Sequence, residues 1–250
     1  MEHEIKVISF NVLYRRCGRG RRFKGVARTI LGEMPDSFGL QEAHARWKLL
    51  LNRELGGLYG IACQTGRFAG LGESVPVYYL KDKYELAGEG VFWLSETPRR
   101  TSWGWDAVLP RVVGYAVLRD RETGFSYAHF NTHFDHKGKI AKVNSARLTA
   151  DRIAELGLPA VLTGDLNAGP GSPTMQQLEA GGLTDLRFAA AETDHGVTHH
   201  GYRGCTGVID YVLANHFLRG AGEFKVIRDE YDGMYPSDHF AVCAKLTLAN

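Results

Sequence analysis

The stretch AVLTGDLN at residues 160–167 joins an apolar strand to a polar end. Its first four residues form a short apolar run of the kind that makes a buried strand. Asp165 and Asn167 follow at once, so a carboxylate and an amide come where the strand stops. A single acid in such a place is more often a turn or capping residue than a catalyst. Its meaning therefore depends on whether the pattern recurs.

The pattern does recur, because polar residues flank several other apolar runs. Asn11 closes the run at 5–10, and Gln41-Glu42 closes the run at 38–40. Strand ends can converge at one rim of a sheet, where a rigid scaffold presents functional groups. The remaining examples are Asn131-Thr132-His133, Asp210 at the start of an apolar strand, and Ser237-Asp238-His239 before residues 240–242.

Between these points the chain alternates strand-like and helical segments. Apolar spacing predicts helices over 26–34, through 47–55 and over 140–156. Val143, Leu148, Ile153 and Leu156 are the expected buried side of the last of these helices. Such a pattern indicates stacked sheets flanked by helices, and nothing interrupts it, so residues 1–250 are predicted to form one domain. The expected strands are 5–11, 38–41, 75–81, 83–94, 112–119, 125–133, 160–163, 208–213, 224–228 and 239–248.

Composition excludes several classes of protein. The formal net charge is only +2, which indicates no general attraction to nucleic acid. The four cysteines form no CxxC pair, which argues against a thiolate zinc site, and Cys243 is expected in the core. No apolar run approaches the roughly 20 residues that cross a bilayer. The strand-like start leaves no room for a signal peptide, so we expect a cytoplasmic protein with no membrane partner.

Two local features have two interpretations each. Residues 15–24 contain five arginines, one lysine and no acid, as expected either for a solvated loop or for a loop that attracts phosphate. Trp103 and Trp105 lie in the segment 99–110 and serve either core packing or the stacking of a base or sugar. For Trp93 we expect core packing.

Taken in order, the polar motifs from Phe10-Asn11 to Ser237-Asp238-His239 resemble those of the endonuclease/exonuclease/phosphatase superfamily, the DNase I-like metal-dependent hydrolases. The stretches FWLSETP (92–98), GWDA (104–107) and THHGY (198–202) resemble a bacterial subgroup whose substrates are mostly unassigned. The last of them stands where that subgroup reads Thr-Phe-His-Gly-Phe. The resemblance implies an α/β (α+β) fold, a four-layer sandwich of two mixed β-sheets face to face with helices outside.

The resemblance also implies a bound Mg²⁺ or Mn²⁺ ion. Glu42 would hold the ion, with Asn11 and Asp238 nearby. This agrees with the preference of hard cations for carboxylate and carbonyl oxygen, and with the few acids that a hydrated Mg²⁺ needs.

Catalytic roles follow from the same resemblance. Asp165 would orient or deprotonate the attacking water, and Asn167 would position it. His239 would bind phosphate or transfer a proton, oriented by the Asp210 carboxylate, which fixes the tautomer of the ring. His133 would donate to a phosphoryl oxygen or assist the leaving group.

Five further residues are expected to bind substrate. Arg111 supplies a planar cation suited to phosphate, and Asn131, Trp105 and His199 belong to motifs that the resemblance covers. Glu73 is expected to pair with His133, or else is an exposed loop acid.

Departures from the family pattern narrow the range of expected substrates. Leu13 stands where base-excision nucleases carry an acid, which argues against abasic-site repair. Residues 207–210, GVID, lack the usual arginine, for which Arg203 would compensate.

Three functions follow. The first is metal-dependent hydrolysis of phosphodiesters in nucleic acid or nucleotides. The second keeps the chemistry but acts on a sugar, inositol or lipid head-group phosphoester, since one fold serves all of these. The third is a non-catalytic binding module, which the intact motifs disfavour. The expected partner is a phosphoester, nucleic acid among the options, and a monomer is the default.

Overall fold

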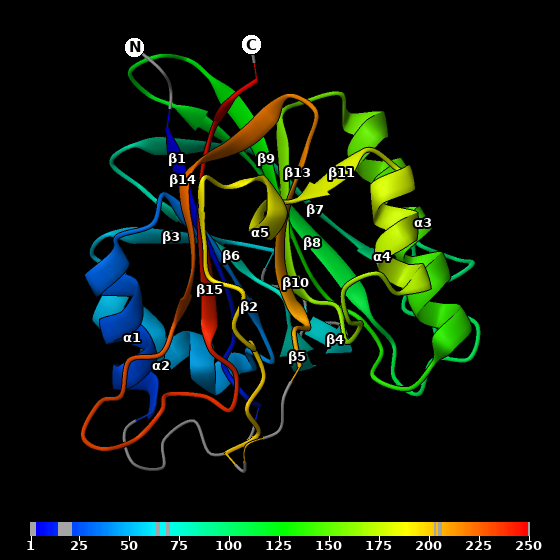
Figure 1. Ribbon diagram of the computed structural model, residues 1–250, viewed down its shortest axis with the longest axis horizontal. Helices are drawn as coiled ribbons and strands as arrows, with labels where there is room; N and C mark the ends of the chain where they lie inside the picture. Colours follow the sequence, from blue (N-terminus) through cyan, green and yellow to red (C-terminus); the bar gives the residue numbers. More distant parts are fainter. Residues whose placement is uncertain are drawn as a thin grey trace.

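Two mixed β-sheets pack face to face at the centre of the computed structural model (Figure 1). The structure describes residues 4–14, 22–63, 66–68, 71–202, 204 and 207–249, with the backbone alone at 66–68 and 71–73. One sheet has the order β12 (Glu192–Thr193), β14 (Leu218–Ile227), β15 (Ala241–Leu248), β1 (Ile5–Asn11), β2 (Ser37–Gln41), β6 (Val77–Leu80), β3 (Tyr59–Ala62). The other has the order β11 (Leu183–Asp185), β13 (Asp210–Asn215), β10 (Ala160–Asp165), β9 (Ser126–His133), β8 (Val112–Asp120), β7 (Tyr84–Trp93).

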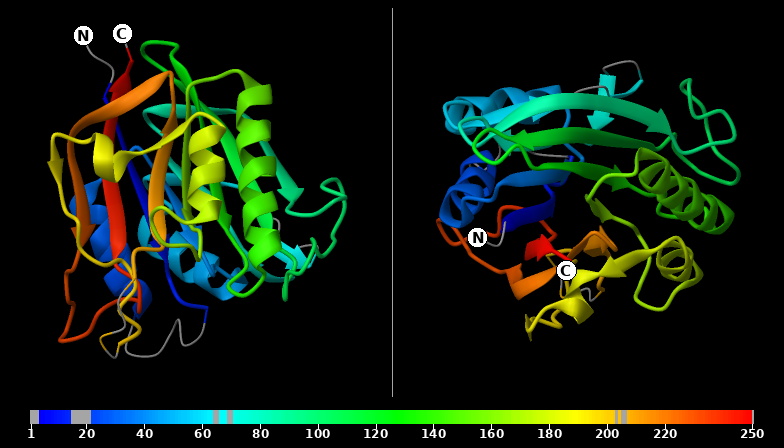
Figure 2. Two further views of the ribbon diagram at one scale, coloured as in Figure 1. Left: turned by 45° about the vertical axis from the view of Figure 1, so that its right-hand side comes forward. Right: turned by 90° about the horizontal axis from the view of Figure 1, so that it is seen from above.

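Helices cover the outer face of each sheet, which gives the four layers seen from above in Figure 2. Helices α1 (Arg22–Glu33) and α2 (Ala45–Leu55) lie against the first sheet. Helices α3 (Lys139–Leu156) and α4 (Pro173–Ala180) lie against the second. The short helix α5 (Leu186–Ala189) and a ribbon of β4 (Gly66–Phe68) and β5 (Leu71–Ser74) complete the described elements. The expected four-layer sandwich is therefore confirmed.

Apolar side chains fill the three interfaces between the layers. Val7, Val161 and Val242 belong to the core between the sheets. Trp47 is fully buried under the first sheet, where a large aromatic contributes much of the apolar area removed from water. Cys243 is also buried there, as expected, and burial raises the pKa of its thiol to about 12. Among the described residues, no helix is both long and apolar enough to cross a membrane.

The prediction for the buried side of α3 was wrong in part. Ile153 is buried, and Leu148 and Leu156 are half-buried and pack against the same core, whereas Val143 is half-buried and is not part of that core. The helix instead buries a stripe of small residues, which lets it approach its neighbours closely. A Cβ on Gly181, just after α4, would lie 2.4 Å from the Ala150 Cβ. The buried residues of the stripe besides Ile153 are Ala141, Ser145, Ala146, Thr149 and Ala150.

Most expected strands are present, with shifted ends. The strand expected at 224–228 begins at Leu218, and the one expected at 208–213 begins at Asp210. The sequence did not predict β3, β11, α4 or α5, which are short elements without a clear apolar period.

Polar contacts link the two sheets. His129 on β9 lies with Nδ1 2.7 Å from Ser37 Oγ on β2, and with Nε2 2.8 Å from Thr163 Oγ1 on β10. Gln41 Nε2 donates to Asn131 Oδ1 across the interface at 2.7 Å. A Cβ on Gly39 would lie 2.3 Å from Thr163 Oγ1, so glycine is required for this close approach.

The buried histidine predicts a pH-dependent stability. Burial lowers the pKa of His129 from 6.5 to about 3, so the unfolded chain binds more protons than the folded one between these pH values. The stabilisation is complete above pH 6.5 and is lost as the pH falls toward 3. The free energy of unfolding of wild type and His129→Gln would be measured with urea at several pH values. Between pH 6 and 4, its change with pH should differ between the two proteins by about 1.4 kcal/mol per pH unit. Equal slopes in the two proteins would contradict this account.

Candidate active site

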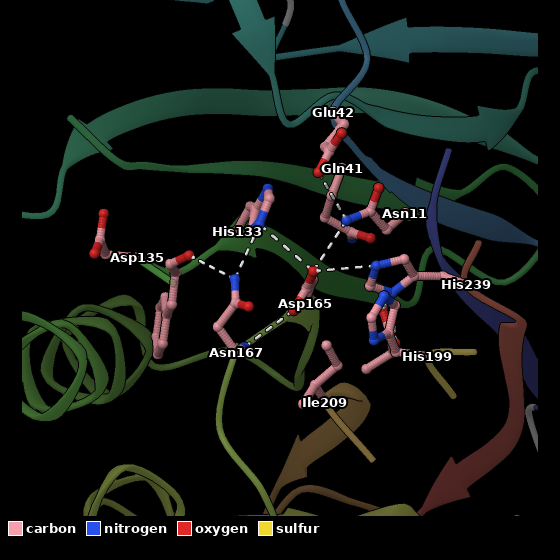
Figure 3. A network of polar contacts seen from close by, with 12 residues as sticks. Asn11, Gln41, Glu42, His133, Asp135, Asp165, Asn167, His199, Ile209 and His239 are labelled. Carbon is pink, nitrogen blue, oxygen red and sulfur yellow. Dashed lines mark hydrogen bonds and ion pairs between the residues drawn. The ribbon is translucent and has the colours of Figure 1, made fainter. Parts of the chain in front are cut away.

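Strand register brings the polar strand ends of both sheets to one end of the sandwich. On the second sheet, Asp165 lies opposite His133 of parallel β9 and opposite Asp210 of antiparallel β13. On the first sheet, Asn11 lies opposite Gln41. Because β15 runs antiparallel to β1, the residues before β15 come to the same end. Figure 3 shows the resulting cluster.

Asp165 lies at the centre of the cluster and is only 2% exposed. Its Oδ2 accepts a hydrogen bond from Asn11 Nδ2 at 2.9 Å and lies 3.4 Å from His133 Nε2 and 3.8 Å from His239 Nε2. Its Oδ1 accepts the backbone N–H of Asn167 at 3.0 Å. Burial raises the pKa of this carboxyl, but the two histidines and the two N–H donors outweigh burial and hold the pKa below its usual value. Asp165 is therefore a buried carboxylate.

His239 is paired with a second buried carboxylate. Its Nδ1 lies 2.9 Å from Asp210 Oδ2, which leaves Nε2 facing Asp165. Burial lowers the pKa of His239, but Asp210, and then Asp165 and Asp238, raise it to about 10. Thr198 is fully buried, and its Oγ1 accepts the backbone N–H of Asp210 at 3.1 Å. This hydroxyl fixes the strand start that carries Asp210.

Asn167 adopts a left-handed backbone conformation, with φ of 48°. In this conformation its Nδ2 lies 3.1 Å from His133 Nε2 and donates to the Phe134 carbonyl oxygen at 3.1 Å. The amide is thereby held beside His133 and Asp165.

Glu42 also has a left-handed backbone conformation, with φ of 62°. Its Oε1 lies 3.4 Å from Asn11 Nδ2, and its Oε2 accepts the backbone N–H of Tyr14. Asn11 Oδ1 accepts the backbone N–H of Leu13 at 2.9 Å. The nitrogen of Asn11, and not its oxygen, thus faces the acids, and coordination through Oδ1 requires rotation of the amide.

The donor set suits a divalent cation. Carboxylates of Glu42 and Asp165 converge on a single amide nitrogen, that of Asn11, so two like charges share one neutral donor. A hard cation held by Glu42 would relieve the repulsion between these two carboxylates. Asp238, from the third motif expected to bind metal, is half-buried and accepts a hydrogen bond from Ser237 Oγ at 3.3 Å.

Arg111 faces the acids from the second sheet. It is 5% exposed, and its Nε lies 3.9 Å from Asp135 Oδ2. Burial lowers the pKa of the guanidinium, whereas Asp135, Asp165 and Glu42 raise it. Asp135 was not predicted. It accepts backbone N–H groups on both sides, including Val108 and Gly138, and so ties the loop at 108–109 to the loop before α3.

The other predicted substrate-binding residues differ in burial, and some lie outside the described part of the chain. Asn131 is fully buried behind the site and donates to the carbonyl oxygens of Leu40 and Pro76, which favours a positioning role. The indole of Trp105 is half-buried, and Trp103 is 54% exposed. The side chain of Glu73, all of Arg203 and residues 15–21 lie outside the described part of the chain.

Arg22, from the basic run, is described and is buried. Its Nε donates to the Pro236 carbonyl oxygen at 2.8 Å and its Nη2 to the Val12 carbonyl oxygen at 2.5 Å. This residue therefore ties the segment after β1 to the segment before Asp238. Arg22 therefore has a structural role, which the sequence did not distinguish from the role of the other basic residues in the run.

Comparisons with known proteins agree with this geometry. The model of the endonuclease/exonuclease/phosphatase family matches residues 8–239. A protein of that family from Bacteroides thetaiotaomicron is 30% identical, with 100% of both chains covered and a TM-score of 0.92. A mannosyl-6-phosphatase from the same organism is 31% identical, with 98% of this chain and 100% of that chain covered and a TM-score of 0.89.

More distant structures show the fold alone. TDP2 of D. rerio, solved with a single-strand DNA product, is 14% identical, with 97% of this chain and 98% of that chain covered and a TM-score of 0.80. No curated protein sequence matches the chain. The family match and the near neighbours nevertheless cover almost all of it. The chain belongs to the endonuclease/exonuclease/phosphatase family, whose members are hydrolases that act on phosphoesters.

Proposed function

We propose that this protein is a divalent-metal-dependent phosphoester hydrolase in which Asp165 activates the attacking water. The observation that carries the proposal is the position of the Asp165 carboxyl group, which is buried between His133 and His239. A buried carboxylate that neighbouring histidines and N–H donors keep ionised can accept a hydrogen bond from a water molecule, orient it and take its proton as it attacks. Water activated there would attack phosphorus in line with the leaving oxygen.

The neighbouring residues would bind and orient the phosphoryl group. His239, charged through its contact with Asp210, and Arg111 would contact phosphoryl oxygens. Asn167 and His133 would hold the water and a further oxygen. Glu42, with Asn11 and Asp238, would hold the Mg²⁺ or Mn²⁺ ion, which relieves negative charge on the phosphoryl oxygens.

We infer that the substrate is a small phosphomonoester such as a sugar phosphate. A mannosyl-6-phosphatase is 31% identical across nearly the whole chain, whereas the DNA-bound neighbour shares only the fold. Net charge is +2, and Arg22 of the basic run is engaged in the fold. These facts weaken the first expectation, hydrolysis of nucleic acid phosphodiesters.

Nucleic acid remains the second candidate because of one observation. Trp103 is 54% exposed in the loop that precedes Arg111. An exposed tryptophan in this loop is a suitable surface for stacking a base, although a sugar ring would also pack against it.

Replacement of Asp165 tests the proposed water activation. Asp165→Asn keeps the shape and the buried position but removes the proton acceptor, so kcat should fall by about 10²–10⁴-fold. Phosphate release would be measured with Mg²⁺, and thermal unfolding would confirm that the variant folds. Asp151→Asn, on the exposed face of α3, serves as the matched control and should keep full activity. Turnover by a folded Asp165→Asn at the wild-type rate would remove Asp165 from this role.

Replacement of Asp210 tests the origin of the charge on His239. Without the carboxylate at 2.9 Å, burial should dominate, and the pKa of His239 should fall from about 10 toward or below 6.5. The measurement is an NMR titration of the His239 ring in metal-free wild type and Asp210→Asn. A pKa that stays near 10 in the variant would assign the effect to Asp165 and Asp238 instead.

A substrate comparison separates the two candidate functions. With Mg²⁺ or Mn²⁺, mannose 6-phosphate should release inorganic phosphate with a higher kcat/KM than that for cleavage of single-stranded DNA. Chelation with EDTA should abolish both reactions. Cleavage of DNA that exceeds sugar phosphate turnover, and that weakens as salt rises, would reverse the order of the two candidates.

A further inference from the structure

His199 lies against His239 at the edge of the site, as Figure 3 shows. The two ring centroids are 4.6 Å apart, and the two residues form an isolated antiparallel bridge. His199 Nε2 lies 4.0 Å from Asp238 Oδ2, and both side chains are half-buried. One nitrogen of each histidine and one oxygen of Asp238 lie within 4.8 Å of one another. Nothing in the proposed hydrolysis requires a second imidazole at this place.

We propose that His199, Asp238 and His239 form a second cation site, selective for a transition metal such as Zn²⁺ rather than for Mg²⁺. Two imidazole nitrogens and one carboxylate suit zinc and similar ions, whereas Mg²⁺ prefers oxygen ligands. The set differs in kind from the oxygens around Glu42, so the two sites would select different ions. Asp238 would be common to both.

The three ligands are held before any ion binds. His239 Nδ1 is occupied by Asp210, which leaves Nε2 as the nitrogen that can bind an ion in place of its proton, as in carboxylate–histidine–metal arrangements. The backbone N–H of His199 donates to the Gly207 carbonyl oxygen at 3.0 Å. The Asp238 carbonyl oxygen accepts the N–H of His200 at 2.9 Å, which pins the two ligand-bearing segments together.

An ion at this site would compete with the proposed reaction. It would bind His239 Nε2, the same nitrogen that is proposed to contact phosphate. Zinc should therefore inhibit Mg²⁺-dependent turnover in wild type and inhibit it less without His199. This consequence rests on the proposed function, whereas the metal site itself does not.

Calorimetric titration of the full chain with ZnCl₂ tests the site directly. His199→Phe keeps a ring that packs on His239 but removes the ligand, so the tightest zinc-binding event should weaken by at least about tenfold. The matched control is His216→Phe, an exposed residue at the other end of β13, which should bind zinc as wild type does. Titration with MgCl₂ should give the same affinity in all three proteins.

Two results would overturn the proposal. One is equal zinc affinity in wild type and His199→Phe, and the other is an equal loss of zinc binding in His216→Phe. If His199→Phe is unstable to heat, His199→Asn replaces it, and the same two comparisons apply. ¹⁵N NMR of the His239 ring gives a further readout: zinc should shift Nε2 in wild type and should not shift it in the variant. A wild type that binds zinc through His199 but hydrolyses no phosphoester would contradict the proposed function alone.

Discussion

The candidate site is divided between the two sheets, so its geometry depends on how the sheets are held against each other. Asn11 and Glu42 come from the first sheet, and His133 and Asp165 come from the second. Apolar packing between the sheets is strong but has little directional preference. The direction comes from buried hydrogen bonds across the interface. Those of His129 and of the Gln41–Asn131 pair join the sheets at fixed side-chain positions. Because these groups are buried, a slipped arrangement would leave them unsatisfied.

The inner faces become more polar toward the site. His129, Asn131 and His133 alternate along β9, so their side chains share the face that meets the other sheet. His129 contacts neighbouring hydroxyl groups, and Asn131 binds the backbone of β2. His133 lies close to Asp165. The same strand thus provides both the support for the site and one of its proposed catalytic residues. The charged groups at the site end of the sandwich depend on one another, because removal of one partner would leave the charge of another uncompensated in a buried place.

Sequence patterns located most strands and the polar residues that flank them, but not the exact strand ends or the residues that support the site. Asp165, His239 and Glu42 were predicted as site residues because they directly flank apolar runs. The order and register of the strands then bring these residues to one end of the sandwich. Asp135 and Thr198 act by accepting backbone N–H groups, which leaves no periodic signal in the sequence. Asn131 has the same residue type and face as a substrate-binding amide, and only its depth between the sheets distinguishes it. The small-residue face of α3 likewise depends on how closely α4 approaches.

At Glu42 and Asn167, the residue type that the left-handed backbone favours differs from the one that the proposed reaction requires. A glycine at either position would adopt the same φ without steric conflict, and so would relax the fold locally. That change would also delete the carboxylate or the amide from the site. Selection for a sturdier chain and selection for turnover therefore favour opposite residues at these two positions. In the proposed mechanism, a glycine at either position would preserve the scaffold and remove a group that the reaction requires.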